Sequence, residues 1–466
     1  MSTYKTPGVY VDEVPPFPPQ IVDVESIPAF VGHTVKAVNA APDDLRLEPT
    51  LVRSMADVVE LFGDSGARDA VVHLSDAAGV PVVERVDPPA IYHPLYFALQ
   101  LYFDNGGRQC HVVSVGSRSE TSPSVPSIAA LMEGVAAVGS QSETTLLVVP
   151  EARSLAPEHY GALTTAILTQ CATRRDRFAI LDLIDGANPD VSLEQARACF
   201  AEGPGLAYGA VYYPDLGTTL RFPYVEAASA DGTVTSNALV RVNGTEAVDV
   251  VALRAGMPDH YAVAVAALRE LPVVVPPSAA VAGAVVRSDT ERGVWKAPAN
   301  LALESVFAPA VMLTDRESER FAVDPISGRS VNTIRAFPGS RATLIWGART
   351  LAGNDPEWKY VSVRRLLMML EQSIDKGTRW VVFEPNNAAT WVKVRATIEN
   401  YLSRKWQEGA FVGATTREAF FVRCGLGSTM TAQDVAEGRL VVEIGVAPVR
   451  PAEFIGIRVV HRTALS

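Results

Sequence analysis

The segment Val363-Arg-Arg-Leu-Leu-Met-Met-Leu-Glu-Gln-Ser-Ile374 has the clearest periodicity in this chain of 466 residues. Its apolar side chains recur on one helix face, and a second stripe with the same spacing follows; the two sets are Val363, Leu366, Leu367, Leu370 and Ile374, then Trp391, Val394, Ile398 and Leu402. Strand-like runs lie at 379–383, 420–424 and 440–445. The sequence therefore predicts an α/β domain over residues 341–452.

Both ends of the chain carry a strand-like sequence that lacks an obvious partner. Residues 1–22 form a predicted extended arm, because its prolines at 15, 16, 18 and 19 keep the backbone extended. Residues 453–466 form a second predicted arm. Neither arm is long enough to bury itself, so we expect each to lie on another part of the chain or on another copy. The predicted strand residues are Val9, Tyr10, Val11, Phe454, Ile455, Ile457 and Val459.

Residues 23–340 show alternating helix and strand patterns. Predicted helices precede apolar strands at 145–149, 178–182 and 207–213. This alternation predicts a mostly parallel sheet that helices cover on both faces. Residues 215–252 break the rhythm with the turn signals Asp231-Gly232 and Asn243-Gly244, which predict an inserted β-rich piece. Gly283, which lies among alanines, predicts close helix packing.

Composition excludes several classes of protein. Hydrophobic residues make up 48% of the chain, which argues against disorder, and the net charge of −11 argues against nucleic-acid binding. The four cysteines lack C-x-x-C spacing, so we expect reduced core residues. The most apolar stretch, 271–286, is interrupted by Pro276-Pro277 and is too short to span a bilayer. The N-terminus lacks the apolar core of a signal peptide, so we expect synthesis and folding in the cytoplasm.

Charge is distributed unevenly along the chain. From residue 341 onward there are 17 Lys and Arg against 12 Asp and Glu, a net charge of +5, so the remainder carries −16. Four basic residues belong to the second predicted helix of the C-terminal domain: Lys393, Arg395, Arg404 and Lys405. Such residues commonly form a solvated face, but in a repeated subunit they can also meet an acidic partner.

Candidate catalytic groups are few. Asp182 and Asp185 follow a predicted strand, where parallel sheets often place catalytic carboxylates. A carboxylate in this place is more often a helix cap or a turn residue. The sequence has neither a phosphate-binding glycine loop nor paired histidines at metal-ligand spacing. We therefore predict no catalytic, cofactor-binding or metal-binding residues and no enzyme activity. A cytosolic α/β hydrolase that uses Asp182 or Asp185 is the alternative.

Several short motifs occur in one order along the chain. They are Thr6-Pro-Gly-Val-Tyr-Val-Asp-Glu13, Phe103-Asp-Asn-Gly-Gly107, Trp346-Gly-Ala-Arg-Thr350, Arg364-Arg365, Phe383-Glu-Pro-Asn386 and Pro451-Ala-Glu-Phe454. In this order they resemble the contractile tail sheath proteins of phages and of phage-tail-like contractile injection systems. The resemblance is weaker at 215–252 and at 321–330.

The resemblance implies an α/β fold in two parts. A C-terminal sheath domain at 341–452 would be completed by N- and C-terminal arm strands exchanged between subunits, and residues 23–340 would form a larger outer α/β domain. The implied function is a structural subunit that polymerises helically around an inner tube and contracts to drive the tube through a target membrane. A non-contractile structural polymer is a further alternative.

The resemblance also implies partners. These are copies of the same chain, an inner tube protein, and baseplate and terminal cap proteins. The resemblance implies no nucleic-acid partner, no direct insertion into a membrane and no cofactor. The basic residues Lys393, Arg395, Arg404 and Lys405 would face the tube. The subunit would be made in the cytoplasm of the producing cell and assembled into a phage tail or an injection particle that can be released.

Overall fold

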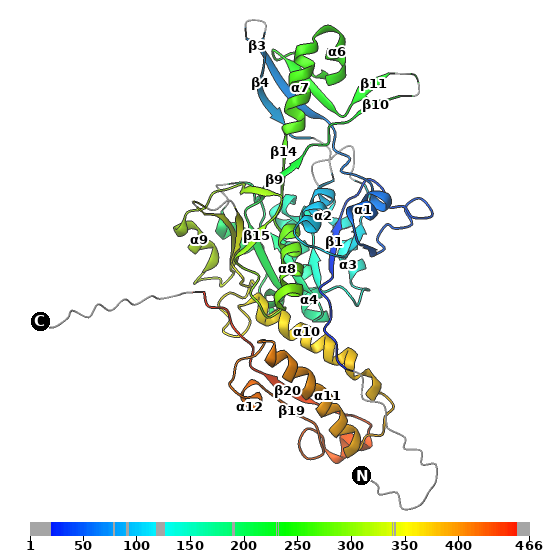
Figure 1. Ribbon diagram of the computed structural model, residues 1–466, viewed down its shortest axis with the longest axis vertical. Coiled ribbons are helices and arrows are strands. Elements are labelled where there is room, and N and C mark those ends of the chain that lie inside the picture. The colour runs from blue at the N-terminus through cyan, green and yellow to red at the C-terminus, as the bar shows by residue number, and fades with distance from the viewer. Residues whose placement is uncertain are drawn as a thin grey trace, which may run out of the picture. The chain divides into compact units, whose positions relative to one another are not determined.

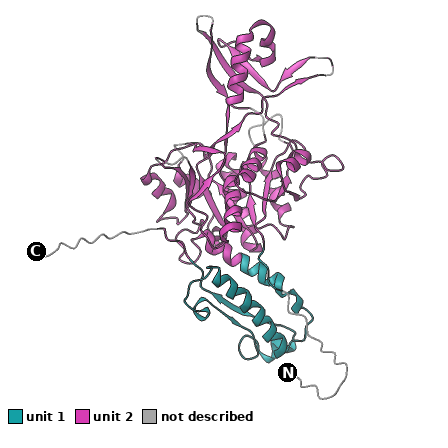
Figure 2. Cartoon of the chain, in the orientation of Figure 1, with its two compact units in different colours: residues 1–24, 369–449 teal, residues 25–368, 450–466 magenta. Residues whose placement is uncertain are grey.

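The computed structural model describes residues 20–77, 80–89, 93–117, 126–188, 192–229, 231, 233–337, 339 and 342–453. The chain forms two compact units, which Figure 2 colours separately. Unit 1 comprises residues 1–24 and 369–449, and unit 2 comprises residues 25–368 and 450–466. The predicted arm strands at 9–11 and 454–459 lie outside the described residues, so their pairing stays a prediction.

Unit 2 is built on a nine-stranded sheet in the order β15-β18-β17-β8-β7-β6-β1-β5-β2. Pairing from β5 through β17 is parallel, whereas β2, β18 and β15 pair antiparallel. Every residue of β1, β5, β7 and β8 is buried, which requires cover on both faces and confirms the predicted sheet. The strands are β1 (Pro28–Gly32), β2 (Thr50–Val52), β5 (Cys110–Ser114), β6 (Leu146–Val148), β7 (Phe178–Asp182), β8 (Gly209–Tyr213), β15 (Leu301–Leu303), β17 (Val331–Ala336) and β18 (Thr343–Trp346).

Two pairs of helices pack on this sheet (Figure 1). One pair is α2 (Pro94–Asp104) with α8 (Ser278–Arg292), and the other is α3 (Ile128–Val138) with α4 (Pro157–Arg174). A Cβ atom on Gly283 would lie 2.4 Å from the carbonyl oxygen of Tyr102, so glycine permits the close α2–α8 contact that the sequence predicted. The shorter helices are α1 (Met55–Phe62), η1 (Pro150–Ser154), α5 (Leu193–Ala198), η2 (Pro204–Tyr208) and α9 (Asp315–Ala322).

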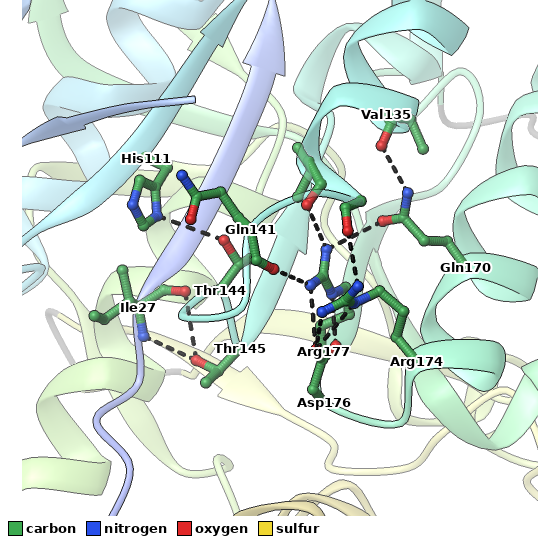
Figure 3. A network of polar contacts seen from close by, with 12 residues as sticks. Ile27, His111, Val135, Gln141, Thr144, Thr145, Gln170, Arg174, Asp176 and Arg177 are labelled. Carbon is green, nitrogen blue, oxygen red and sulfur yellow. Dashed lines mark hydrogen bonds and ion pairs between the residues drawn. The ribbon is translucent and has the colours of Figure 1, made fainter. Parts of the chain in front are cut away.

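A buried arginine joins α3, α4 and β7 (Figure 3). The side chain of Arg177, which is fully buried, donates to the carbonyl oxygens of Val138 at 2.8 Å and Gln141 at 2.5 Å. Asp176 balances its charge at 2.8 Å, and Arg174 donates to the Gly139 carbonyl at 2.8 Å. Cations at a helix C-terminus satisfy carbonyls that lack a partner within the helix. The network therefore closes the end of α3 against the strand that follows α4.

Two stretches of unit 2, far apart in sequence, share a four-stranded sheet in the order β13-β12-β3-β4. β3 (Ala70–Ala77) pairs in parallel with β12 (Ala238–Val242), and α7 (Pro258–Glu270) packs on β3 and β4 (Val80–Asp87) around a separate apolar core. The β-rich stretch at 215–252 is thus one half of a folded piece whose other half lies near 64–88. The remaining elements nearby are β9 (Leu216–Arg221), β10 (Glu226–Ala228), β11 (Val234–Ser236), β13 (Val248–Asp249), η3 (Val250–Ala252), α6 (Leu253–Gly256), β14 (Pro272–Val275) and β16 (Val306–Pro309).

Unit 1 contains the second predicted helical stripe and the end of the first. The division between the units falls inside α10 (Val361–Thr378), and α11 (Ala388–Gln407) carries the second stripe, of which Val394, Ile398 and Leu402 are buried. The compact unit begins at 369 rather than 341, because β18 pairs in the large sheet of unit 2. Its other elements are η4 (Arg379–Val381), α12 (Thr416–Ala419), β19 (Phe420–Arg423), α13 (Ala432–Ala436) and β20 (Glu443–Val446).

The predicted strand at 379–383 is wrong. Residues 379–381 form η4 directly after α10, and Phe383 has a φ of 73° and a fully exposed side chain. The Trp-Val-Val-Phe run has strand propensity, but propensity yields a strand only where a neighbouring strand can pair with it. Asn387 caps the start of α11 by accepting from the amides of Ala389 and Thr390, so the segment serves as a helix connection.

Substitution of Gly283 tests the helix contact. Gly283→Ala should lower the free energy of unfolding by about 1–3 kcal/mol, because the added methyl group meets a backbone carbonyl that cannot rotate away. Gly256→Ala in α6 is the control, since a Cβ atom there has no atom within 4 Å. Chemical denaturation of both variants measures the difference, and equal stabilities would contradict the packing account.

Candidate functional site

β19 and β20 form an antiparallel pair on unit 1, with Phe420 opposite Val446 and Arg423 opposite Glu443. Among the described residues the two strands pair only with each other, so each leaves one edge open. Phe420 and Val422 are buried, and β19 contacts α11. A two-stranded sheet is marginal by itself, and an open edge is a template for another strand. This sheet can therefore accept further strands.

The other face of the pair has its own side-chain arrangement. Phe421 and Arg423 are exposed, and the Arg423 guanidinium lies 4.7 Å from the centre of the Phe421 ring. A Cβ atom on Gly445 would lie 2.2 Å from that ring, so the glycine lets the ring lie across β20. An aromatic residue that covers a cross-strand glycine stabilises the register of a sheet. The Phe421–Gly445 contact therefore holds β19 and β20 in one register before any further strand is added.

The end of the N-terminal arm and the residues that follow it are anchored on α10 and α11. Tyr401 donates to one Asp23 carboxylate oxygen at 2.7 Å, and Lys405 binds the other at 2.6 Å. Arg404 donates to the Ile21 carbonyl at 2.7 Å. Ile21 is 1% exposed and packs on Gly377, where a Cβ atom would lie 2.5 Å from it. Burial raises the pKa of Tyr401 far above its usual value, so its hydroxyl stays a donor.

The first residue of the C-terminal arm is anchored within unit 2. The Arg349 guanidinium binds both carboxylate oxygens of Glu453, at 2.8 and 2.6 Å, and the Tyr360 hydroxyl donates at 3.0 Å. Burial acts to raise the pKa of Glu453, but the hydrogen bonds from Arg349 and Tyr360 outweigh it and hold the pKa below its usual value. Bidentate pairs of this kind are among the stronger polar contacts in proteins.

Arg349 is itself held by β17. The Asn332 side chain accepts from the Arg349 amide and donates to the Arg349 carbonyl, both at 2.8 Å, and it is 2% exposed. A Cβ atom on Gly347 would lie 2.6 Å from the Asn332 side-chain oxygen, so the glycine allows this approach. The segment 347–349 is therefore fixed to the large sheet by backbone groups, which leaves the Arg349 side chain to bind Glu453.

The alternative catalytic residues occupy structural positions. Asp182 accepts from the Ser278 amide at 2.7 Å and its hydroxyl at 2.5 Å, so it caps α8. Burial raises the pKa of Asp182 to about 8, against those hydrogen bonds. Asp185 is a turn residue with a φ of 53°. The nearby cavity lined by Arg153 has a volume of about 10 Å³, space for about one water molecule. This cavity among the described residues is too small for a substrate.

Other binding chemistries also lack support among the described residues. Within them, acidic, histidine and cysteine side chains form no group of three or more that could hold a metal ion. The helices in the described part of the chain also include none with the length and apolarity needed to cross a bilayer.

Comparisons with known proteins point to one family. The phage tail sheath C-terminal domain family matches residues 353–462. The tail sheath protein of Enterobacteria phage T4 is 26% identical over 134 residues, which cover 28% of this chain and 19% of that protein's length. The contracted sheath of PVC, an extracellular contractile injection system, is 26% identical over 99% of this chain and 98% of its own, with a TM-score of 0.64. Over nearly its whole length the chain is thus similar to contractile tail sheath proteins.

Further relatives agree with this assignment. The contracted helical sheath of the anti-feeding prophage is 29% identical over 98% of this chain and 99% of its own, with a TM-score of 0.61. A chain of the same particle's contracted baseplate is 26% identical over 98% of this chain and 99% of its own, with a TM-score of 0.66. The protein is thus a structural subunit of a contractile sheath, and its mixed α/β fold is a sheath fold.

The basic residues of the sheath subunit do not act as one group. Lys393 and Arg395 are exposed on α11, and Arg395 lies 3.7 Å from Glu399. Lys405 is 5% exposed and binds Asp23, and Arg404 holds the backbone of residue 21. A buried, paired amine presents little charge to a partner, so Lys405 is corrected to an anchoring residue. Contact of Lys393 and Arg395 with a tube stays a prediction.

The structure explains motifs that sequence reasoning left unconnected. Arg349 in the segment 346–350 binds Glu453 in the segment 451–454, across 104 positions. Arg364 lies between the rings of Tyr208 and Trp358, with its guanidinium 4.0 and 4.4 Å from their centres. The signal that could have found the first pair is charge complementarity between the two motifs.

The raised pKa of Asp182 predicts a pH dependence. The folded subunit keeps a proton on Asp182 between its ordinary pKa of 3.8 and about 8, whereas the unfolded chain loses it. Stability should therefore decrease as pH rises through this window. Asp182→Asn cannot ionise but can still accept from Ser278, so its melting temperature should fall less between pH 5 and pH 8. Asp259→Asn, at an exposed position of α7, is the control, and equal slopes for all three proteins would refute the assignment.

Proposed function

We propose that this sheath subunit polymerises helically around an inner tube and is linked to its neighbours by exchange of the arms at 1–22 and 453–466. The observation that carries the proposal is the open β19–β20 sheet, which has two strands among the described residues. The strand-like sequences at 9–11 and 454–459 supply the residues for further strands. The contracted sheaths among the relatives support contraction of the assembled polymer.

The backbone hydrogen bonds of one exchanged arm would be strong enough to hold neighbouring subunits together in a polymer. A strand of about five residues forms about five backbone hydrogen bonds, each worth roughly 0.5–1.5 kcal/mol net. Several kcal/mol per arm would hold neighbours together by β-augmentation, independent of how their globular faces slide. Contraction would then convert one packing of unchanged subunits into another. This chemistry needs no nucleotide, so we propose no enzymatic role.

We further propose partners at both ends and inside the sheath. The baseplate relative supports association with a baseplate, and a terminal cap would close the other end. The exposed pair Lys393 and Arg395 would meet an acidic surface of the inner tube. The driven tube would cross the target membrane while the sheath stays outside it. The subunit would be made in the cytoplasm of the producing cell and released within a phage tail or an injection particle.

Removal of the arms tests strand exchange. Chains that lack residues 1–19 or 454–466 retain all the anchoring residues described above, so they should fold with unchanged melting temperatures. They should remain small by size-exclusion chromatography, whereas the full chain should form tubular polymers visible by negative-stain microscopy. Tubular polymers from either truncated chain would show that the arms are not the links.

Charge reversal tests the tube contact. Lys393→Glu with Arg395→Glu should abolish sheath growth on purified tubes, because like charges would then face each other. Self-assembly without tubes should continue. Arg269→Glu, at an exposed position of α7, is the control for the general effect of charge. Extended sheaths of normal length on tubes from the double variant would contradict a tube-facing role.

A further inference from the structure

We propose that two clamps, one in each compact unit, are positioning elements that set the length of each arm and therefore the spacing between sheath subunits. The N-terminal clamp consists of Asp23 with Tyr401 and Lys405. The C-terminal clamp consists of Glu453 with Arg349 and Tyr360. This inference rests on the proposed exchange of arms between neighbours, and it adds the residues that determine where each arm leaves its subunit.

The N-terminal clamp holds a segment that has no helix or strand of its own. Residues 20–24 lie outside any helix or strand, and Val22 is 74% exposed, so the contacts of the neighbouring residues hold the segment on α10 and α11. Lys405 lies between the carboxylates of Asp23 at 2.6 Å and Glu408 at 2.5 Å. Loss of one partner of a buried charge is costly, which makes the segment hard to detach. The amide of Val24 adds a bond to Ser373 at 3.1 Å.

In the C-terminal clamp, as in the N-terminal one, a cationic side chain and a tyrosine hydroxyl bind one carboxylate. Residues 450–453 also lack helix and strand structure, and the Glu453 carboxylate accepts three hydrogen bonds from Arg349 and Tyr360. Arg349 is fixed to β17 through Asn332, so the clamp connects the start of the arm to the large sheet. A planar, bidentate contact restrains direction as well as distance. Glu453 therefore defines where the arm starts and which way it leaves.

The two clamps belong to different units. Asp23 and its partners lie in unit 1, whereas Glu453 and its partners lie in unit 2 (Figure 2). A neighbour attached through the N-terminal arm would pull on unit 1, and a neighbour attached through the C-terminal arm would pull on unit 2. Force along the polymer would then pass through each subunit at the three chain crossings, 24–25, 368–369 and 449–450.

Release of a clamp would lengthen its arm without removing the strand. If residues 21–24 or 450–453 detach, the unanchored part of the arm gains four residues, which span about 13 Å when extended. That length exceeds the roughly 4.8 Å between neighbouring strands of a sheet. Strand exchange would continue, but the distance between linked subunits would no longer be fixed. The arms would thus link the subunits into a polymer, and the clamps would keep the distance between linked subunits constant.

The test compares clamp variants in sheaths assembled from the full chain. Asp23→Asn and Glu453→Gln should still polymerise, but cryo-electron microscopy should show an axial rise that varies by several ångströms within one sheath, because each arm gains up to about 13 Å of slack. Tyr401→Phe and Tyr360→Phe each remove a single hydroxyl and should give a smaller spread. If the melting temperature shows that a carboxylate variant does not fold, the two Tyr→Phe variants still test the inference.

Matched controls separate the clamps from general loss of charge. Asp375→Asn removes the partner that Arg379 binds at 3.0 Å on the surface of α10, and Asp315→Asn removes the partner that Arg335 binds at 2.7 Å. Both should give sheaths with wild-type spacing. Wild-type spacing in the folded clamp variants would overturn the inference while leaving strand exchange intact. Polymers from the truncated chains would instead overturn the exchange itself, so the two failures are distinguishable.

Discussion

The pair of hydrogen bonds between Asn332 and the backbone of Arg349 connects the large sheet of unit 2 to the residue that binds the start of the C-terminal arm. Asn332 also donates to the Val211 carbonyl at 3.2 Å, so a single buried amide joins β8, β17 and the segment that carries Arg349. A buried amide with its partners satisfied specifies one arrangement, because any displacement leaves polar groups unpaired. The position of Glu453, and with it the start of the C-terminal arm, follows from this contact.

Unit 1, in contrast, has backbone groups on its strand edges that lack a partner strand among the described residues. Its β19–β20 sheet has open edges among the described residues, and the exposed Phe383 has a backbone conformation that is uncommon for an aromatic residue. A subunit that must pack with many copies benefits from a rigid centre and incomplete edges. The nine-stranded sheet supplies the first, because its central strands are buried on both faces. The open pair supplies the second, and the clamps connect the arms to both units.

Two buried carboxylates with raised pKa values occupy structural positions. Burial raises the pKa of Asp182 to about 8 and that of Asp215 to about 6, which in an enzyme would suggest acid–base chemistry. Here Asp182 caps α8, and Arg153 binds Asp215 at 2.9 Å. A carboxylate at a strand end can stabilise the amides at the start of a following helix, as Asp182 does, or balance a buried cation, as Asp215 does. The sheath family assignment agrees with this structural reading.

Local pattern determined much of the fold. The period of apolar residues predicted α10, α11 and the parallel strands, since period and burial are properties of neighbouring residues. The motif order indicated the family. Tertiary structure alone decided the contacts that join Asp23 to Lys405 and Arg349 to Glu453, because such pairs depend on how loops of 382 and 104 positions close. It also turned residues 379–383 into a helix connection, since strand propensity has no effect without a neighbouring strand.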